Sequence, residues 1–517
     1  MKKILQLIII TFTFIGYGQN WTELIKLEPS DQNSDDNHAI SAAISGDFAI
    51  AGAWHQNFAG GGSANLNDAG AAYIYHYNST TEVWEEEAKL VAADREAGDE
   101  FGISVDISGT FAVIGAVVED GARGAAYVFE KDSGSGLWVQ VAKLVAPVQH
   151  SNDRFGVSVA IDGNTIVVGA QHEDEDEDET DQKLNAGSAY IYTRVNDDWG
   201  FYQKIVASDR DVNDNFGYSV GIHNTHIIIG AYRYDPDGIE IGGAYVFELI
   251  GGFWEEIKIL KATDSYQGDE FGWAVDVHND LYIVGAPYHD YDTNNSNQKN
   301  NAGAAYIFDA NNSWAENKVV HSNRNMQDNL GEDVAIYGTR VVVGSPLQDY
   351  GVDGDPPYWG NGGAAFVYEK DGIGFWNQTQ KLLTNDRFSA DKFGHSVAIY
   401  NNTIIGGAPE DNGIIGPSTG ALYVFKDETL AVNDIDFATS LSLYPNPTSN
   451  QININLDRSY REIDVQVSNY LGQVVLNKRF SNTKQFSLQL GNFKSGIYIV
   501  ELVTDSGNKA TLKVIKR

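Results

Sequence analysis

The stretch that decides the fold is residues 152–192, NDRFGVSVAIDGNTIVVGAQHEDEDEDETDQKLNAGSAYIY. It opens with a Phe-Gly pair at 155–156 and a short apolar strand. A polar turn leads to a β-branched strand that ends at Gly169, and a long acidic loop leads to a third strand. That strand carries Tyr190 and Tyr192, two residues apart, so both rings lie on one face of it. The stretch therefore predicts three antiparallel strands with a long loop between the second and the third.

The Phe-Gly pair recurs along most of the chain, and a repeat of this length determines the architecture. Seven copies are spaced 54 to 63 residues apart when counted on the sequence. They are Phe101-Gly102, Phe155-Gly156, Phe216-Gly217, Phe271-Gly272 and Phe393-Gly394, with His38-Ala39 and Leu330-Gly331 as degenerate copies. We interpret the glycines of the anchors and second strands as positions of close backbone packing rather than as a phosphate-binding loop.

A tryptophan opens a fourth strand in every unit: Trp21, Trp84, Trp138, Trp199, Trp254, Trp314 and Trp376. Trp21 precedes the first anchor, and no equivalent strand follows Phe425. We therefore expect Trp21–Leu27 to pair with Ala421–Phe425 and to complete the last unit. Four antiparallel strands per unit, repeated radially, predict an all-β fold, a seven-bladed β-propeller closed by an N-terminal strand. The alternative is an open row of β-units or two sandwiches, in which the offset strand has no use.

Composition limits the partners and the chemistry. The chain has 517 residues, no cysteine and a formal net charge of −36. A strongly acidic chain is a poor partner for nucleic acid, because phosphate binding needs basic surface. Without cysteine there is no disulfide, zinc-thiolate site or cysteine nucleophile.

The chain divides into four segments. Residues 1–18 combine two lysines with an apolar run and small residues, which predicts a secretory signal peptide rather than an anchor helix. Residues 19–429 form the propeller, residues 430–440 are a polar linker, and residues 441–517 are a second domain. We expect no transmembrane span in the mature chain, since no other stretch approaches about 20 apolar residues.

The repeated pattern Asp-x-Phe-Gly-x-Ser-Val, followed by Val-Gly-Ala and Gly-Ala-Ala-Tyr-Val-Phe, resembles FG-GAP repeats, the units of the integrin α-chain propeller. The resemblance implies a seven-bladed propeller and a role in adhesion or ligand recognition. Integrin-type repeats carry a calcium loop between the first and second strands. Here that turn is as short as Asp162-Gly163-Asn164, which cannot supply the six or more oxygens that Ca²⁺ takes. Those calcium sites are therefore not carried over.

The second domain carries several motifs in a specific order: Tyr444-Pro445-Asn446-Pro447, Leu471-Gly472-Gln473, Gly496-Ile497-Tyr498 and the basic end Lys513–Arg517. Its alternating strands predict a small β-sandwich. The motifs resemble the C-terminal sorting domain of the type IX secretion system. The resemblance implies export across a bacterial outer membrane, followed by release or attachment at the cell surface. An ordinary adhesion module of similar shape is the alternative.

The loops between the second and third strands of each unit, which we call the 2–3 loops, are the candidate binding region. In a propeller they emerge on one face with the loops that join units, so this face should be loop-rich and acidic. Aspartates two residues apart can direct two carboxylates at one cation, and Ca²⁺ is the one cofactor that the sequence suggests. A solvated acidic loop is the alternative, favoured for Glu173–Asp181. The candidate ligands are Asp174, Asp176, Asp235, Asp237, Asp290, Asp292, Asp353 and Asp355.

A second acidic position lies two residues before each anchor, in all seven copies from Asp36 to Asp391. A feature of every unit is expected to build the unit, so we interpret these aspartates as acceptors of backbone N–H groups where the chain enters the inner strand. A ring of seven carboxylates that attracts a cation is the alternative.

No catalytic constellation stands out in the sequence, and it has no His-Glu-x-x-His helix. Trp54 and Trp359 fall in or beside the 2–3 loops and are candidates for stacking on a sugar or a partner side chain. We expect a monomeric, non-enzymatic protein, secreted or at the cell surface, that binds an extracellular protein or glycan. The rivals are a polysaccharide hydrolase or lyase on a propeller scaffold and a structural surface-layer spacer.

Overall fold

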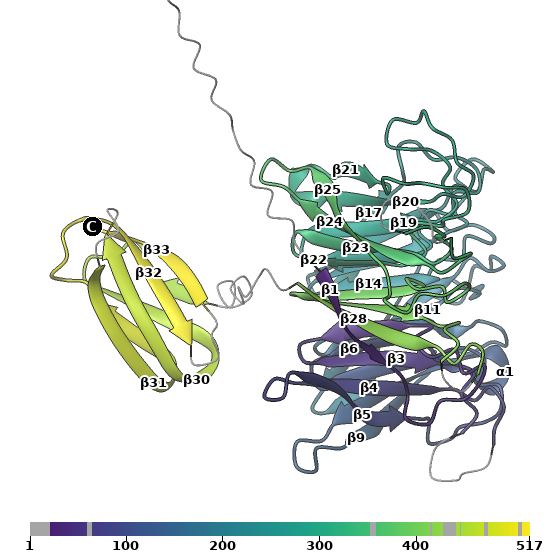
Figure 1. Cartoon of the computed structure of the whole chain (residues 1–517), viewed down its shortest axis with the longest axis horizontal. Coiled ribbons are helices and arrows are strands. Elements are labelled where there is room, and N and C mark those ends of the chain that lie inside the picture. The colour runs from purple at the N-terminus through teal and green to yellow at the C-terminus, as the bar shows by residue number, and fades with distance from the viewer. Residues whose placement is uncertain are drawn as a thin grey trace, which may run out of the picture. The chain divides into compact units, whose positions relative to one another are not determined.

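The computed structural model describes residues 21–58, 65–351, 358–413, 416–427, 441–444, 446–469, 474–504 and 509–517. The predicted signal peptide and linker lie outside the described residues. Two compact units are present, residues 1–427 and residues 428–517. The described residues form strands and turns, apart from a helical turn α1 (Glu119–Ala122) and a 3₁₀ turn η1 (Ala310–Asn312) (Figure 1).

Within the described residues, the first unit contains seven four-stranded antiparallel sheets. The first sheet consists of β2 (Ala42–Ser45), β3 (Phe48–Ala53), β4 (Ala71–Asn78) and β5 (Val83–Leu90). The second consists of β6 (Phe101–Ser108), β7 (Phe111–Ala116), β8 (Ala125–Lys131) and β9 (Trp138–Leu144). The third consists of β10 (Phe155–Asp162), β11 (Thr165–Ala170), β12 (Ser188–Val195) and β13 (Asp198–Ile205).

The next three sheets follow the same order. They are β14 (Ser219–His223), β15 (His226–Ala231), β16 (Gly243–Ile250) and β17 (Phe253–Leu260); β18 (Val275–His278), β19 (Leu281–Ala286), β20 (Ala304–Asp309) and β21 (Ala315–Val319); and β22 (Val334–Tyr337), β23 (Arg340–Ser345), β24 (Ala364–Lys370) and β25 (Trp376–Leu382).

The last sheet joins the two ends of the unit. It contains β26 (Ser396–Tyr400), β27 (Thr403–Ala408) and β28 (Ala421–Asp427), with β1 (Trp21–Leu27) as its fourth strand. β1 pairs antiparallel with β28, with Trp21 opposite Asp427 and Leu27 opposite Leu422. The pairing predicted from the offset tryptophan is therefore confirmed.

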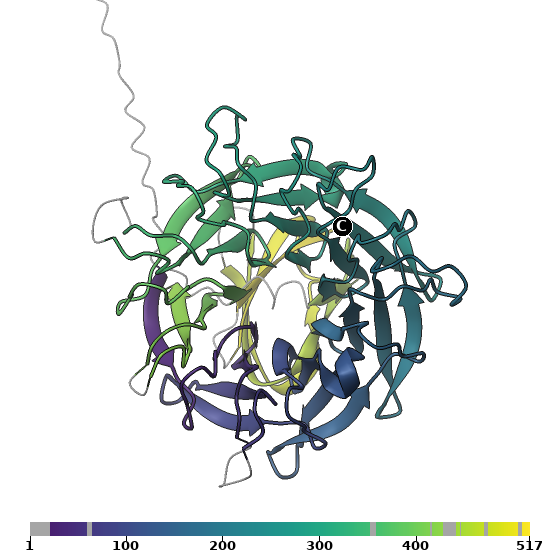
Figure 2. The same cartoon turned by 90° about the vertical axis from the view of Figure 1, so that its right-hand side faces the viewer.

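Neighbouring sheets are linked by one isolated parallel bridge each. A glycine just before the third strand of one sheet pairs with the anchor of the next sheet. The bridges are Gly70 to Phe101, Gly124 to Phe155, Gly187 to Phe216, Gly242 to Phe271, Gly303 to Leu330, Gly363 to Phe393 and Gly420 to His38. The last of these joins the seventh sheet to the first, and Figure 2 shows the sheets arranged radially around a common centre. Both degenerate anchors therefore occupy the same position as the intact ones.

Close backbone contact explains the glycines of the second strands. A Cβ on Gly169 would lie 1.9 Å from the carbonyl oxygen of Gly217, the anchor glycine of the next sheet. Gly217 itself has φ +90°, in the left-handed region that favours glycine. The anchor phenylalanines lie in the cores between sheets: Phe155 shares a core cluster with residues of the preceding sheet, and its ring lies 5.4 Å from Tyr190 and 6.2 Å from Tyr192 of its own sheet, centroid to centroid. The predicted packing role of both glycines is confirmed.

The aspartates before the anchors build the entry turns. In all seven copies the carboxylate accepts a hydrogen bond from the backbone N–H three residues earlier, at 2.5–2.7 Å. Asp214, for example, accepts from Asp211. The structural interpretation of these aspartates is therefore confirmed.

The second unit is a five-stranded sheet of β29 (Ser442–Tyr444), β30 (Gln451–Asn469), β31 (Val474–Gln489), β32 (Gly496–Thr504) and β33 (Lys509–Lys516). The long strand β30 pairs with β29, β31 and β32. Its core includes Ile454, Val467, Leu488 and Val500. The predicted sandwich stays a prediction.

Gly169→Ala tests the contact between sheets, because its methyl group would collide with rigid backbone. We expect a loss of about 3 kcal/mol or more in the free energy of unfolding. Gly200→Ala in β13 is the matched control, since a Cβ there has no atom within 4 Å, and it should stay within about 0.5 kcal/mol of wild type. Chemical denaturation measures both, and equal effects would contradict the packing role.

Candidate functional site

The 2–3 loops gather on one face of the first unit, on the right in Figure 1 and toward the viewer in Figure 2. Four of the predicted calcium ligands stabilise their own loops there. Asp174 accepts from the N–H of Asn185, and Asp176 accepts from Thr180. Asp290 and Asp292 act in the same way, since they accept backbone N–H groups from Asn301 and Ser296. These paired carboxylates therefore bind loop backbone, and calcium binding stays a prediction.

Arginines from the loops that join sheets hold the 2–3 loops in place. Arg210 donates to the carbonyls of Asp174 and Asp181 at 2.5 and 2.7 Å. Arg324 donates to the carbonyls of Asp290 and Asn297 at 2.8 and 2.9 Å. Arg387 donates to the carbonyls of Gln348 and Tyr350 in the same manner. Carbonyl oxygens that could coordinate a cation are thus already bound by buried guanidinium groups.

The remaining candidates are spread over the face. Asp235 and Asp237 lie in a turn where the N–H of Gly238 donates to the Asp235 carbonyl. Trp54 stacks on His55, with ring centroids 4.1 Å apart, and its Nε1 is buried without a hydrogen-bond partner among the described residues. Trp359 packs against Phe388 at 5.3 Å. Asp353 and Asp355 lie outside the described residues.

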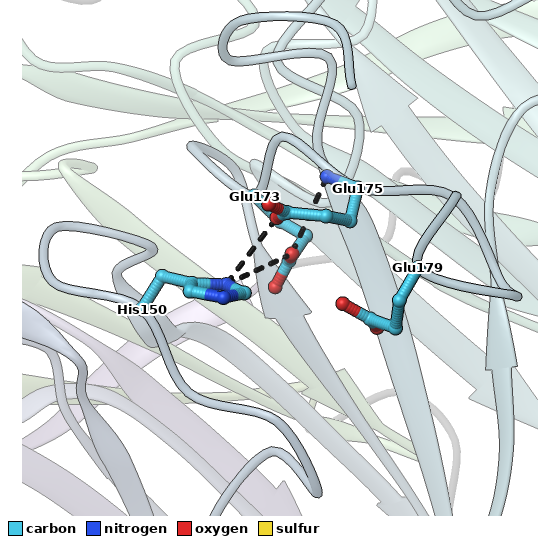
Figure 3. A group of neighbouring side chains, drawn as sticks. All are labelled: His150, Glu173, Glu175 and Glu179. Atoms are coloured by element: carbon cyan, nitrogen blue, oxygen red, sulfur yellow. Dashed lines mark hydrogen bonds and ion pairs between the residues drawn. The ribbon is translucent and has the colours of Figure 1, made fainter. Parts of the chain in front are cut away.

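One His and carboxylate group in the described part of the chain has the geometry of a metal site (Figure 3). His150, Glu173, Glu175 and Glu179 place one ligand atom each within 4.8 Å of one another. His150 Nδ1 lies 3.3 Å from Glu175 Oε2 and 3.9 Å from Glu173 Oε1. Glu173 and Glu175 are buried, whereas His150 and Glu179 are exposed. None of the predicted calcium ligands belongs to this group.

A lysine competes with a metal ion at this group. Lys204 Nζ lies 2.8 Å from Glu179 and 3.5 Å from Glu173, so one positive charge already lies among the carboxylates. Burial raises the pKa of Glu173 to about 8. Burial alone would raise the pKa of Glu175 too, but hydrogen bonds from Glu173 and Gln182 outweigh it and lower that pKa. A raised pKa at Glu173 and the charge of Lys204 both reduce the negative charge of this group without a metal.

A different cluster lies at the inner ends of the sheets on the loop-rich face. We call it the axial cluster, and its residues lie within two positions of an anchor pair or of the end of a second strand. Tyr218, Tyr232 and Trp273 contact one another, with ring centroids 4.6 to 5.2 Å apart. Tyr288 meets Trp273 edge-on at 6.0 Å. All four rings are half-buried, so part of each ring faces solvent.

Charged side chains surround these rings. Burial raises the pKa of Glu270 and of Glu332 to about 7 each, although the charge of Arg233 opposes this at Glu270 and that of Lys392 opposes it at Glu332. Arg154 and Arg233 both lie close enough to His172 to lower its pKa, together with burial, which is the main cause. The cluster thus combines aromatic surface with positive and negative groups from several sheets.

Sequence reasoning missed the axial cluster, although a signal was present. The residue after the anchor glycine is Ile40, Ile103, Val157, Tyr218, Trp273, Glu332 or His395. Its neighbours on either side repeat closely from copy to copy, whereas this position changes chemical class. Variation at one position inside an otherwise regular repeat indicates a residue that does not build the repeat.

Comparison with known families agrees with this geometry. The FG-GAP repeat matches six segments, residues 21–75, 84–129, 138–192, 199–247, 254–308 and 376–425, which together cover more than half of the chain. The chain therefore belongs to the FG-GAP repeat family, and the resemblance found in the sequence is confirmed. The unmatched region, 309–375, contains the degenerate anchor Leu330-Gly331, yet it supplies a sheet of the same kind.

Residues 442–517 match the secretion system C-terminal sorting domain. The predicted type IX sorting domain is therefore confirmed, and it implies export by type IX secretion to the cell surface or the extracellular space. Among the described residues, no helix is long and apolar enough to cross a membrane.

Two curated proteins are similar to parts of the chain. An endo-acting ulvan lyase of Formosa agariphila is 24% identical over 200 residues, 36% of this chain and 38% of the lyase. Integrin alpha-11 of Homo sapiens is 36% identical over 89 residues, 16% of this chain and 7% of the integrin. The chain thus spans well under half of the length of either relative.

Calcium binding by the 2–3 loops can be tested by thermal unfolding in EDTA and in millimolar Ca²⁺. A ligand of the folded state raises the melting temperature. We expect no change, because Arg210, Arg324 and Arg387 already bind the loop carbonyls. A higher melting temperature in Ca²⁺, together with binding heat in calorimetry, would support the calcium site instead.

Stability should fall as pH rises from 5 to 8. The folded-state pKa is raised by burial to about 7 for Asp214 and Asp276 and to about 8 for Glu173. A carboxyl group whose pKa is raised in the folded state contributes its whole stabilisation when the pH is below its pKa in the unfolded state, near 4. That contribution is lost as the pH rises through its pKa in the folded state. We expect a loss of at least about 1 kcal/mol in the free energy of unfolding, measured by denaturation at each pH.

Glu173→Gln should weaken this pH dependence, because it removes one titrating group and keeps its shape. Glu255→Gln on the exposed surface of β17 removes the same charge and should leave the slope unchanged. A wild-type protein that is equally stable at pH 5 and pH 8 would contradict the role of the buried carboxyls.

Proposed function

We propose that this is a non-enzymatic binding protein whose first unit is a closed seven-bladed propeller. The ring of bridges between sheets, including Gly420 to His38, supports the closed form. The sorting domain takes the protein to the cell surface or beyond, where the loop-rich face binds a protein or a glycan.

The observation that carries the proposal is the axial cluster. Tyr218, Trp273 and Glu332 occupy a position that has no duty in the repeat and changes from sheet to sheet. Their side chains are half-buried on the loop-rich face, and Trp273 also packs against the core beneath it. Aromatic surface beside a few polar groups is the usual composition of a binding site.

A polysaccharide lyase is the second candidate, favoured by the partial likeness to an endo-acting ulvan lyase. The axial cluster contains groups that could move a proton, since Glu270 and Glu332 have pKa values of about 7. A general base or acid works best with a pKa near the operating pH. A spacer in a surface layer is the third candidate, and it would need no axial cluster.

One experiment separates these candidates. The mature protein is screened on glycan and protein arrays and is incubated in parallel with ulvan, with product release followed by chromatography. We expect specific binding on the arrays and intact ulvan. Ulvan cleavage would favour the lyase, and the absence of both binding and cleavage would favour the spacer.

A further inference from the structure

Two arginines of the axial cluster, Arg154 and Arg233, form no ion pair, although Glu100 lies near Arg154 and Glu270 near Arg233 at longer range. The chain has 71 acidic and 35 Lys and Arg residues, so a basic side chain is expected to find a carboxylate nearby. Lys143 and Lys318 do so at 2.6 and 2.7 Å. Among the described residues, no carboxylate lies within ion-pair distance of Arg154 or Arg233. Two exposed positive charges are thus available on the loop-rich face.

The backbone holds Arg154 at this place. It directly precedes the anchor Phe155 and has φ +57°, in the left-handed region that a branched or long side chain rarely adopts. Its N–H donates to the carbonyl of Ala122 in the preceding sheet at 3.1 Å. The residue before the anchor has a positive φ in every copy, from Asn37 to Lys392, so this conformation belongs to the repeat and fixes where the Arg154 side chain leaves the backbone.

Arg233 and the aromatic rings lie side by side. The Arg233 guanidinium is 5.7 Å from the centre of the Tyr232 ring, and that ring is 5.2 Å from Trp273. Glu270 influences the pKa of Tyr232 together with Arg233 and Arg154, so the charges and the ring share one neighbourhood. Glu270 Oε2 is buried and has no hydrogen-bond partner among the described residues.

We propose that the axial cluster binds an acidic sugar residue of an anionic polysaccharide, with Arg154 and Arg233 on the acid group and Tyr232 and Trp273 against the sugar ring. This inference rests on the proposed binding function and names its ligand. Guanidinium groups bind carboxylate and sulfate oxygens by paired hydrogen bonds.

The arrangement favours a sugar over an acidic peptide. Four half-buried rings contact one another at interplanar angles of 52° to 88°, and an exposed ring face suits the C–H face of a pyranose better than a flexible aspartate or glutamate side chain. A neutral glycan would leave both guanidinium groups without an anion. The net charge of −36 repels polyanions elsewhere on the protein, so binding should concentrate at this cluster.

The test measures binding of the full-length mature protein to immobilised polygalacturonate, fully methyl-esterified polygalacturonate, dextran sulfate and neutral dextran. We expect binding to one of the two anionic polymers. The affinity for its neutral counterpart should be weaker by about tenfold or more. Polygalacturonate alone would indicate carboxylate recognition, and dextran sulfate alone would indicate sulfate recognition. Affinity should fall as salt increases, because the acid group is bound by charge.

Variants locate the site. Arg154→Gln and Arg233→Gln should each weaken binding about tenfold or more, because each removes one charge-assisted hydrogen bond to the ligand. Arg123→Gln is the matched control on the same face, since Arg123 is already paired with Asp120, and it should bind as wild type. Trp273→Ala should abolish binding, whereas Tyr266→Ala on an exposed ring should not.

Several results would overturn the inference. They are equal binding of charged and neutral polymers, an Arg123→Gln effect as large as that of Arg233→Gln, or no binding to either anionic polymer. If the arrays show a protein or neutral glycan ligand whose binding survives Arg154→Gln and Arg233→Gln, the acidic-sugar site is wrong while the binding function stands.

Discussion

The fold depends on one repeated contact between backbones of neighbouring sheets. The glycine one residue before the end of a second strand lies against the carbonyl of the next anchor, and a Cβ at Gly52, Gly115 or Gly169 would stand only 1.9 to 2.0 Å from that oxygen. Because the contact involves backbone on both sides, it fixes the distance between sheets without regard to side chains. The seven sheets can then differ freely in their loops and at their inner ends.

The acidic loops are stabilised by cations that the chain itself provides. In several sheets a lysine of the fourth strand and a tyrosine of the third strand both bind one aspartate, as Lys318 and Tyr306 bind Asp264. The sixth sheet shows that these residues form a unit, because Asn323 and Phe366 replace the aspartate and the tyrosine. There Lys381 donates to Gln348 and to loop carbonyls instead, and burial lowers its pKa to about 7. Aspartates of the loops that join sheets therefore have cationic and hydroxyl partners within the chain itself.

Features that the repeat itself encodes were predictable from the sequence, and the partners of individual loop side chains were not. The pairing of Trp21–Leu27 with the last sheet followed from counting tryptophans, and the role of the anchor aspartates followed from their presence in every copy. The partners of Asp290 and Asp292 did not follow, because the N–H groups of Asn301 and Ser296 approach only when the loop folds back. The arginines that bind loop carbonyls were also hidden, since Arg210 lies far in sequence from Asp174.

The axial cluster shows where a repeat protein can place function. Residues that every sheet shares, such as the anchors and the aspartates before them, are required for packing and turns. Tyr218, Trp273 and Glu332 occupy equivalent places in three successive sheets, where a side chain of any class is tolerated. Neighbouring sheets bring these places into contact, as Tyr218 and Trp273 show. A substitution in one sheet therefore alters a surface shared with the next sheet. Ligand choice can therefore change at these places while the contacts that build the fold stay the same.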